Sequence, residues 1–269
     1  MRRFIVTLLG LLGCNLLQAA PAVSATPSPA FAAVTLPTRE KFHLYLLMGQ
    51  SNMAGRDTSK LDSQVDNPRI LMLDAAGQWV VARDPMFPVQ GRTKPGAGPG
   101  IPFATEMLKA DPKVTIGLVP LAVGGSGLKH WEKSGDYYAR TIAAAQAVAK
   151  VGTISGVLWH QGETDATKPQ TADTYEARLT KMFGNLRQDL GQPDLPIVVG
   201  QIGSFLNPVR EPGASTVRAA LKHIPTVVPE VGFADSDGLT DKGDQLHFNA
   251  DSQRELGARF AKAMQALQK

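Results

Sequence analysis

Residues 46–55 read Leu46-Leu47-Met48-Gly49-Gln50-Ser51-Asn52-Met53-Ala54-Gly55, an apolar run that leads into a serine flanked by two amides. The apolar run predicts a buried strand that ends at Gly49. The Ser51 hydroxyl would then lie at the carboxyl end of a strand, where open α/β sheets hold their ligands. A nucleophilic serine needs such a place, close to free backbone N–H groups. Serine is also a favoured helix cap, so this segment alone leaves both interpretations open.

The rest of the chain alternates apolar runs of strand length with helical patterns, which is typical of βαβ units. We expect strands at Phe42–Met48, Val114–Pro120, Ile154–His160, Leu195–Gln201 and Val231–Ala234. We expect helices at Pro102–Ala110, Tyr137–Val151, Ala172–Leu190, Ser215–Ile224 and Asn249–Leu267. The pair Arg69–Leu73 and Gln78–Ala82 reads as a small inserted hairpin. The pattern predicts an α/β fold, a three-layer α/β/α sandwich around a mostly parallel, five-stranded, doubly wound sheet.

The N-terminus has the features of a secretory signal peptide. Arg2 and Arg3 precede the apolar run 4–12, and Val23-Ser24-Ala25 offers a small-residue cleavage site. The run is too short to span a bilayer comfortably, and no later segment has the length of a membrane helix. We therefore expect a signal peptide at 1–25, cleaved after Ala25, a linker at 26–39 and one domain at 40–269. The mature protein would be secreted or periplasmic.

The only cysteine and the net charge limit the class of protein further. Cys14 follows Leu11-Leu12-Gly13, which faintly resembles a lipoprotein attachment site, so a lipid anchor is the alternative to soluble export. Without Cys14 the mature chain has neither disulfides nor a thiolate metal site. Removing Arg2 and Arg3 lowers the formal charge from +4 to +2. This small charge is scattered along the chain and argues against nucleic acid as a partner.

Polar residues collect after four of the predicted strands. The segments are Ser51 after the first strand, 122–127 after the second, 159–165 after the third and 241–248 after the last. In a doubly wound sheet these loops converge on one crevice. They supply a hydroxyl, a glycine turn, an amide with a carboxylate, and an Asp–His pair.

These residue types suit acyl transfer. A serine hydroxyl is a weak nucleophile until a base takes its proton, and His247 is the best candidate because Asp244 lies three residues earlier and could orient it. The oxyanion of the tetrahedral intermediate needs preorganised donors. The backbone N–H groups of Ser51 and Gly125 and the side-chain NH₂ of Gln161 are the candidates. This chemistry requires no metal, nucleotide or flavin cofactor.

Other polar residues have competing interpretations. Gln50 and Asn52 flank Ser51, and His130 and Trp131 lie in a loop near the site, so all four are candidates for contact with substrate. His43 and His223 read as ordinary strand and helix-end residues, and His160 as a structural residue. The acidic run 235–244 could instead hold calcium, although it lacks the spacing of an EF-hand loop.

Four motifs together resemble the SGNH/GDSL hydrolase superfamily, and more closely its carbohydrate esterase family 6 (acetylxylan esterase) and sialate O-acetylesterase-like branch. The motifs are Gly49-Gln50-Ser51-Asn52-Met53, Gly124-Gly125-Ser126, His160-Gln161-Gly162-Glu163 and Asp244-Gln245-Leu246-His247-Phe248. The resemblance covers residues from about 41 to the C-terminus. It implies an SGNH-like fold with flavodoxin-like strand order. The superfamily's Gly-x-Asn-Asp block is replaced here by the block that contains Gln161.

The resemblance implies Ser51 as nucleophile, His247 as base and Asp244 as the orienting acid, with Glu163 as the rival acid. It implies an oxyanion hole of Ser51, Gly125 and Gln161. The function implied is an exported serine esterase that hydrolyses O-acetyl esters on carbohydrates through an acyl-enzyme. Acetylated xylan, sialic acid and cell-envelope glycans are alternative substrates. A non-catalytic carbohydrate-binding protein and a calcium-dependent structural protein are alternative functions.

Overall fold

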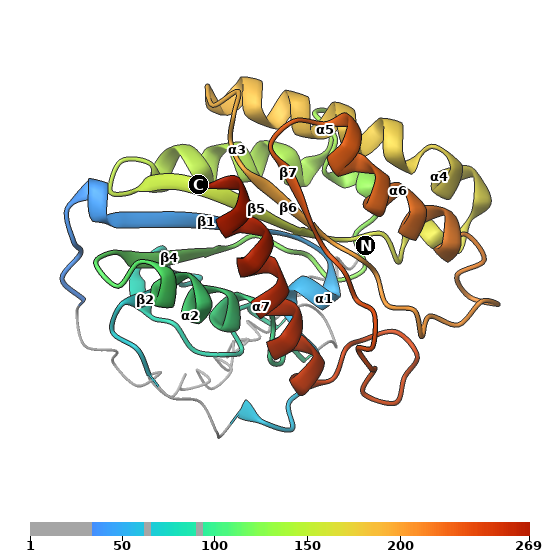
Figure 1. Cartoon of the computed structure of the whole chain (residues 1–269), viewed down its shortest axis with the longest axis horizontal. Helices are drawn as coiled ribbons and strands as arrows, with labels where there is room; N and C mark the ends of the chain where they lie inside the picture. The colour runs from blue at the N-terminus through green and yellow to red at the C-terminus, as the bar shows by residue number, and fades with distance from the viewer. Residues whose placement is uncertain (1–33, 62–65, 90–93) are drawn as a thin grey trace, which may run out of the picture. The chain divides into compact units, whose positions relative to one another are not determined.

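The computed structural model describes residues 34–61, 66–89 and 94–269 (Figure 1). The expected signal peptide, its cleavage site after Ala25 and Cys14 lie outside the described residues.

One seven-stranded sheet organises the fold, in the order β3-β2-β4-β1-β5-β6-β7. The strands are β1 (Phe42–Gly49), β2 (Ile70–Leu73), β3 (Trp79–Val81), β4 (Thr115–Pro120), β5 (Thr153–His160), β6 (Ile197–Gly200) and β7 (Val231–Ala234). Every pair is parallel except β2 with β3. The five strands expected from the sequence form the run β4-β1-β5-β6-β7, which is the flavodoxin-like order 2-1-3-4-5.

The expectation of five strands was wrong, because the predicted hairpin belongs to the sheet. Its first strand, β2, pairs in parallel with β4, with Ile70 opposite Ile116 and Leu71 opposite Gly117. Ile70 and Leu71 are buried, so the hairpin gains apolar burial by extending the edge of the sheet. The strand β3 then closes that edge.

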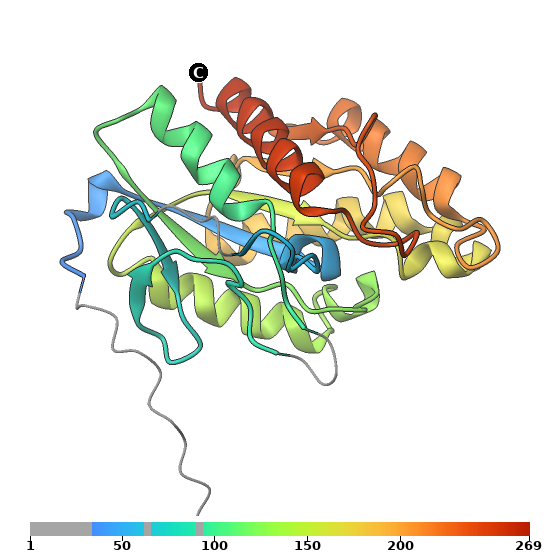
Figure 2. The same cartoon turned by 90° about the horizontal axis from the view of Figure 1, so that it is seen from below.

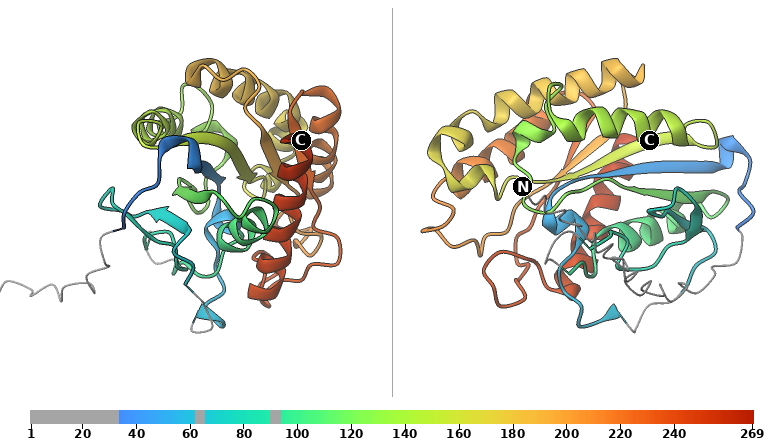
Figure 3. Two further views of the ribbon diagram at one scale, coloured as in Figure 1. Left: turned by 60° about the vertical axis from the view of Figure 1, so that its left-hand side comes forward. Right: turned by 180° about the vertical axis from the view of Figure 1, so that it is seen from behind.

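Helices cover both faces of the sheet (Figures 1, 2 and 3). They are α1 (Ser51–Ala54), α2 (Gly100–Ala110), α3 (Asp136–Val148), α4 (Pro169–Asp173), α5 (Tyr175–Leu190), α6 (Ala214–Val227) and α7 (Ala250–Leu267), with 3₁₀ turns η1 (Arg39–Lys41), η3 (Leu128–His130) and η4 (Asp165–Thr167). Helices α3, α5 and α6 pack on one face, and α2 and α7 pack together on the other. This confirms the three-layer α/β/α arrangement. In the part of the chain that the structure describes, no helix is long and apolar enough to cross a membrane.

The predicted helix at 172–190 is in fact two helices. Pro169 opens α4 at its first turn, where its missing N–H costs nothing, and Thr174 separates α4 from α5. The break brings Tyr175 into the core, where its hydroxyl donates to the Gln161 carbonyl over 2.8 Å. The second helix is thereby fastened to the loop that follows β5.

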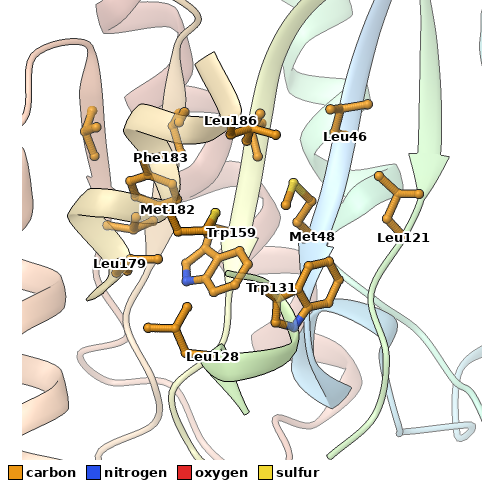
Figure 4. Packing of buried hydrophobic residues seen from close by; sticks show 14 of the residues in the cluster. Leu46, Met48, Leu121, Leu128, Trp131, Trp159, Leu179, Met182, Phe183 and Leu186 are labelled. Carbon is orange, nitrogen blue, oxygen red and sulfur yellow. The ribbon is translucent and has the colours of Figure 1, made fainter. Parts of the chain in front are cut away.

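Alternate residues of β1 enter two cores, one on each face of the sheet. Leu44, Leu46 and Met48 face the core under α3 and α5, whereas Tyr45 and Leu47 face the core under α2 and α7. Figure 4 shows the first core around two tryptophans, Trp131 and Trp159, whose ring centroids lie 5.5 Å apart. These cores hold the carboxyl ends of the strands in fixed positions.

Candidate active site

The strand β1 ends in a backbone conformation that only glycine adopts readily. Gly49 has φ = +125°, and a Cβ at this position would clash with the backbone carbonyl of His160 at the end of β5. Next in the chain, the Gln50 N–H donates to that carbonyl over 2.9 Å. Ser51 then begins α1, with Gln50 in the cap position and with no side-chain cap bond. Ser51 is therefore not a helix cap, and its hydroxyl is free for other contacts.

Ser51, His247 and Asp244 form a continuous hydrogen-bonded chain. The Ser51 hydroxyl donates to His247 Nε2 over 3.0 Å, and His247 Nδ1–H donates to Asp244 Oδ2 over 2.7 Å. Ser51 is only 5% exposed. The serine comes from the end of β1 and the other two from the segment between β7 and α7, so the fold brings together residues that are 196 positions apart. This geometry is that of a nucleophile, its base and the base's orienting acid.

The Asp244 carboxylate is held by its own loop. Its Oδ1 accepts the N–H groups of Leu246 at 3.0 Å and His247 at 2.8 Å, and Lys242 Nζ lies 3.0 Å from Oδ2. Burial alone would raise the pKa of Asp244, but the hydrogen bonds from His247 and Lys242 outweigh it and hold the pKa well below its ordinary value. Asp244 is therefore ionised at neutral pH and fixes the orientation of the imidazole.

Glu163, the rival acid, binds a different partner. Its Oε1 accepts Asn52 Nδ2 over 2.6 Å and lies 3.7 Å from His160 Nδ1, which is too long for a hydrogen bond. Among the described residues no hydrogen bond or ion pair joins Glu163 to His247. Geometry thus favours Asp244 over Glu163 as the orienting acid.

Gln161 does not lie where a third oxyanion donor is needed. The side chain is completely buried, and its NH₂ group is directed at Gln50 Oε1 (3.1 Å), the Ser126 carbonyl (3.2 Å) and Asp165 Oδ2 (2.8 Å). Its Oε1 accepts the hydroxyl of Tyr175 over 3.0 Å. The expectation of an oxyanion role for Gln161 was wrong, because the buried carboxylate of Asp165 draws its amide away from the cavity.

Unlike the Gln161 amide, the backbone N–H groups of Ser51 and Gly125 have positions that suit oxyanion donors. Within 34–61, 66–89 and 94–269, the N–H groups of Ser51 and Gly125 have no hydrogen-bond partner. Both residues line one cavity of about 340 Å³ together with His247. Gly125 has φ = +72°, so its N–H is presented by a left-handed turn. A carbonyl oxygen in this cavity could therefore receive two backbone hydrogen bonds.

The four residues expected to contact substrate have different positions. Gln50 lines the cavity, and its Oε1 accepts Gln161 Nε2 and the Thr164 N–H. His130 lines an adjoining cavity of about 290 Å³ and is paired with Asp136.

For the other two residues the expectation was wrong, because both are completely buried. Trp131 packs in the core and donates its indole N–H to Ser126 Oγ. Asn52 is a bridge between loops, with bonds to Glu163, the Leu246 carbonyl and the Phe248 N–H. Both residues support the site from behind rather than touch a substrate.

The structure adds three cavity residues that sequence reasoning missed, Arg56, Thr167 and Glu211, and it adds Thr164 and Leu246 from segments that were expected at the crevice. Arg56 directly follows the 46–55 segment, and this position next to the serine motif could have identified it as a candidate cavity residue. Glu211 lies in a loop between β6 and α6 that carries no motif, so only the fold reveals it.

The remaining candidates have structural contacts. His160 is completely buried, and burial lowers its pKa, so it is a neutral core residue. In the acidic run, Asp241 Oδ2 accepts the N–H groups of Gly243 and Gln245, and Asp235 pairs with Arg259. These carboxylates stabilise their own loop and α7.

At the carboxyl edge of the doubly wound sheet, hydrogen bonds join a serine, a histidine and an aspartate, which is the arrangement of a serine-dependent acyl-transfer site. A family model described as "Carbohydrate esterase, sialic acid-specific acetylesterase" matches residues 41–266, and the chain belongs to this family. The protein is therefore a carboxylic ester hydrolase of the acetylesterase kind, as the motifs predicted.

Known proteins agree with this assignment. The chain is 33% identical over 242 residues to the probable carbohydrate esterase At4g34215 of Arabidopsis thaliana, covering 82% of this chain and 89% of the plant protein. The X-ray structure of that plant protein has a TM-score of 0.75 at 30% identity and covers 86% of this chain and 99% of its own. The carbohydrate acetylesterase XAC1771 of Xanthomonas citri has a TM-score of 0.65 at 22% identity, over 83% of this chain and 56% of its own, and supports the fold.

Proposed function

We propose that the protein is an exported serine esterase that removes O-acetyl groups from carbohydrates through an acetyl-enzyme on Ser51. The observation that carries this proposal is the hydrogen-bonded chain from Ser51 through His247 to Asp244, at 3.0 and 2.7 Å, with Ser51 and His247 on the wall of a cavity. Export is supported by the sequence pattern of residues 1–25 alone.

The chemistry follows from these contacts. His247 Nε2 takes the Ser51 proton as Oγ attacks the acetyl carbonyl, and the ionised Asp244 stabilises the imidazolium that forms. The tetrahedral intermediate collapses with loss of the sugar oxygen, which receives the proton from His247. Water then attacks the acetyl-enzyme, with His247 as base, and acetate leaves with Ser51 restored.

The oxyanion would be held by the N–H groups of Ser51 and Gly125. The side-chain NH₂ of Gln50, rather than that of Gln161, would be the third donor. Gln50 Oε1 is engaged by Gln161 and Thr164, while its Nε2 has no hydrogen-bond partner among the described residues. Because Gln50 lines the cavity, its NH₂ group is available to the substrate. Gln161 then acts indirectly, by fixing the Gln50 amide.

The lining of the cavity supports a sugar rather than a fatty-acid ester. Apart from two glycines, Leu246 is its only apolar residue among those that the structure describes. Its volume of about 340 Å³ suits one acetylated sugar residue rather than a long acyl chain.

A second substrate, acetylated sialic acid, is favoured by one observation. The adjoining cavity of about 290 Å³ shares Gly125, Thr164 and Thr167 with the first, and is also lined by Lys129 and Lys168. Neither lysine has an acidic partner within the described residues, so both could pair with the carboxylate of a sugar acid. A neutral acetylated glycan would not use this pair.

The test is acetate release by the purified protein and by Ser51→Ala from three esters: 4-nitrophenyl acetate, acetylated xylan and O-acetyl sialic acid. We expect the wild type to cleave 4-nitrophenyl acetate and at least one of the sugars, and Ser51→Ala to lose roughly 10⁴-fold or more. Equal release by both proteins would exclude Ser51 as nucleophile. Activity on 4-nitrophenyl acetate with neither sugar cleaved would contradict the carbohydrate assignment.

A further inference from the structure

Two buried glutamates, Glu163 and Glu211, line the cavity that contains Ser51, and each has one carboxylate oxygen without a partner among the described residues. We propose that Glu163 and Glu211 form a hydroxyl-binding subsite, which accepts hydrogen bonds from free hydroxyl groups next to the acetyl ester on the substrate sugar. This inference rests on the proposed function and deepens it. It assigns the enzyme to esters that keep a free hydroxyl beside the acetyl group.

Glu163 has one oxygen engaged and one free. The residue is only 2% exposed, Oε1 accepts Asn52 Nδ2 over 2.6 Å, and the buried Oε2 has no partner among the described residues. An unpaired buried acceptor is expensive, so native proteins rarely leave one without a ligand or water. Since Glu163 lines the cavity, a group bound there can supply the missing donor.

Glu211 reaches the same cavity from another loop. It is 6% exposed, and its Oε2 also has no partner within the described residues. Its backbone is fixed, because its N–H donates to the Asn207 carbonyl at 2.9 Å and its own carbonyl accepts the Ala214 N–H at 3.0 Å. Burial raises the pKa of Glu211, Arg210 opposes this, and the negative charge of Glu163 adds to the rise. Glu163 and Glu211 therefore line one cavity from two different loops, each with one unpartnered carboxylate oxygen among the described residues.

The groups around this pair complement a sugar. A sugar hydroxyl donates to a carboxylate oxygen, and such charge-assisted bonds are stronger than neutral ones. Arg56 lines the same cavity, and its Nε is buried without a partner among the described residues, while Nη1 donates to the Gly55 carbonyl. The residues that line the cavity with Ser51 thus carry two unpartnered acceptors and one unpartnered donor, a combination that matches the alternating donors and acceptors of a polyol. A hydroxyl-free acetate ester uses none of them.

The experiment compares three substrates: a mono-O-acetylated pyranoside, the same ester with the neighbouring hydroxyl replaced by hydrogen, and 4-nitrophenyl acetate. The variants are Glu211→Gln and Glu163→Gln, with Glu106→Gln as the matched control, since Glu106 lies on α2 and pairs with Lys109. Glutamine keeps the shape but removes the charge. Glu211→Gln is the primary variant, because Glu163 also anchors Asn52.

We expect the wild type to prefer the hydroxyl-bearing ester over its deoxy counterpart by at least tenfold in kcat/KM. Glu211→Gln should reduce this preference at least fivefold, and Glu106→Gln should keep it. A preference that is absent in the wild type, or unchanged in both glutamine variants at the site, overturns the subsite while the proposed function stands. A wild type that cleaves 4-nitrophenyl acetate but neither sugar ester overturns the proposed function itself.

Discussion

The Asn52 side chain donates to Glu163 Oε1 over 2.6 Å and so ties the loop after β1 to the loop after β5. The same amide donates to the Leu246 carbonyl at 3.0 Å and accepts the Phe248 N–H at 3.1 Å. Asn52 therefore joins the three segments that carry the nucleophile, the buried glutamate and the base. Its complete burial makes it a positioning residue, one step behind the reacting atoms.

Replacing Asn52 by alanine should loosen this junction. The change leaves Glu163 Oε1 and the Phe248 N–H without partners, which costs about 2–3 kcal/mol and lowers Tm by roughly 5–10 °C. We also expect kcat to fall, because the backbone on both sides of His247 loses a support. Thermal unfolding and 4-nitrophenyl acetate hydrolysis measure the two effects. Asn67→Ala, in a surface turn with one local bond, is the control and should lower Tm far less.

The choice between Asp244 and Glu163 as orienting acid can be tested by charge-neutral replacement. Asp244→Asn should lower kcat for 4-nitrophenyl acetate by roughly 10⁴, since asparagine favours the wrong imidazole tautomer. Glu163→Gln should cause a loss at least a hundredfold smaller, because Glu163 has no contact with His247 in the described structure. Steady-state kinetics of both folded variants decides the matter. The opposite order of losses would assign the acid to Glu163.

The buried carboxylate of Glu211 should reduce stability at neutral pH. Its folded pKa is raised, chiefly by burial, so between its unfolded and folded pKa values the folded state binds more protons than the unfolded state. Stability from this group is therefore present below about pH 4 and is lost as pH rises through the folded pKa. The substitution Glu211→Gln removes the ionisable group and with it this loss of stability at neutral pH. We expect its Tm to exceed that of the wild type by roughly 2–4 °C at pH 7.

The pH series supplies the check on this prediction. The difference in Tm between Glu211→Gln and wild type should shrink towards zero below about pH 4, where both states of Glu211 are protonated. Glu106→Gln, at a half-buried position on α2 where the carboxylate pairs with Lys109, should show no such trend. A destabilised Glu211→Gln at pH 7 would mean that the carboxylate has a favourable partner in the free enzyme.

The sequence predicted the five parallel strands well because each is a largely apolar run, and β1, β5 and β6 are buried over most of their length. It misplaced the hairpin, since periodicity identifies Ile70–Leu73 as a strand but not the neighbour with which it pairs. That neighbour, β4, lies more than forty residues further along the chain. The helix break at Thr174 was equally hidden, because it serves a contact between Tyr175 and Gln161 that only the tertiary fold creates.

The same limit applies to the site. Ser51, His247 and Asp244 could be found because their roles fix both residue type and spacing. Sequence could not say which way a neighbouring amide points, so Asn52 was predicted to touch substrate but faces the scaffold. Gln161 was misassigned for the same reason, since its direction depends on the buried carboxylate of Asp165.

Alanine substitution at two glycines can distinguish the effect of backbone strain on stability from the effect of a lost oxyanion donor on kcat. Gly125 (φ = +72°) and Gly191 (φ = +65°) are both left-handed, and a Cβ at either would have no heavy atom within 4 Å. Alanine at each position should therefore cost about 1–2 kcal/mol of strain, or roughly 2–8 °C in Tm. Gly191 ends α5, whereas Gly125 presents its N–H to the cavity that contains Ser51.

We expect Gly125→Ala to lower kcat for 4-nitrophenyl acetate at least tenfold, because a shifted N–H no longer meets the developing oxyanion, and loss of one such donor costs about 10²–10³. Gly191→Ala should keep wild-type kcat despite a similar fall in Tm. Parallel unfolding and kinetic measurements on the two variants distinguish the effects. If Gly125→Ala loses stability but keeps full kcat, its N–H is not an oxyanion donor, and the donors must then be sought at Ser51 and Gln50.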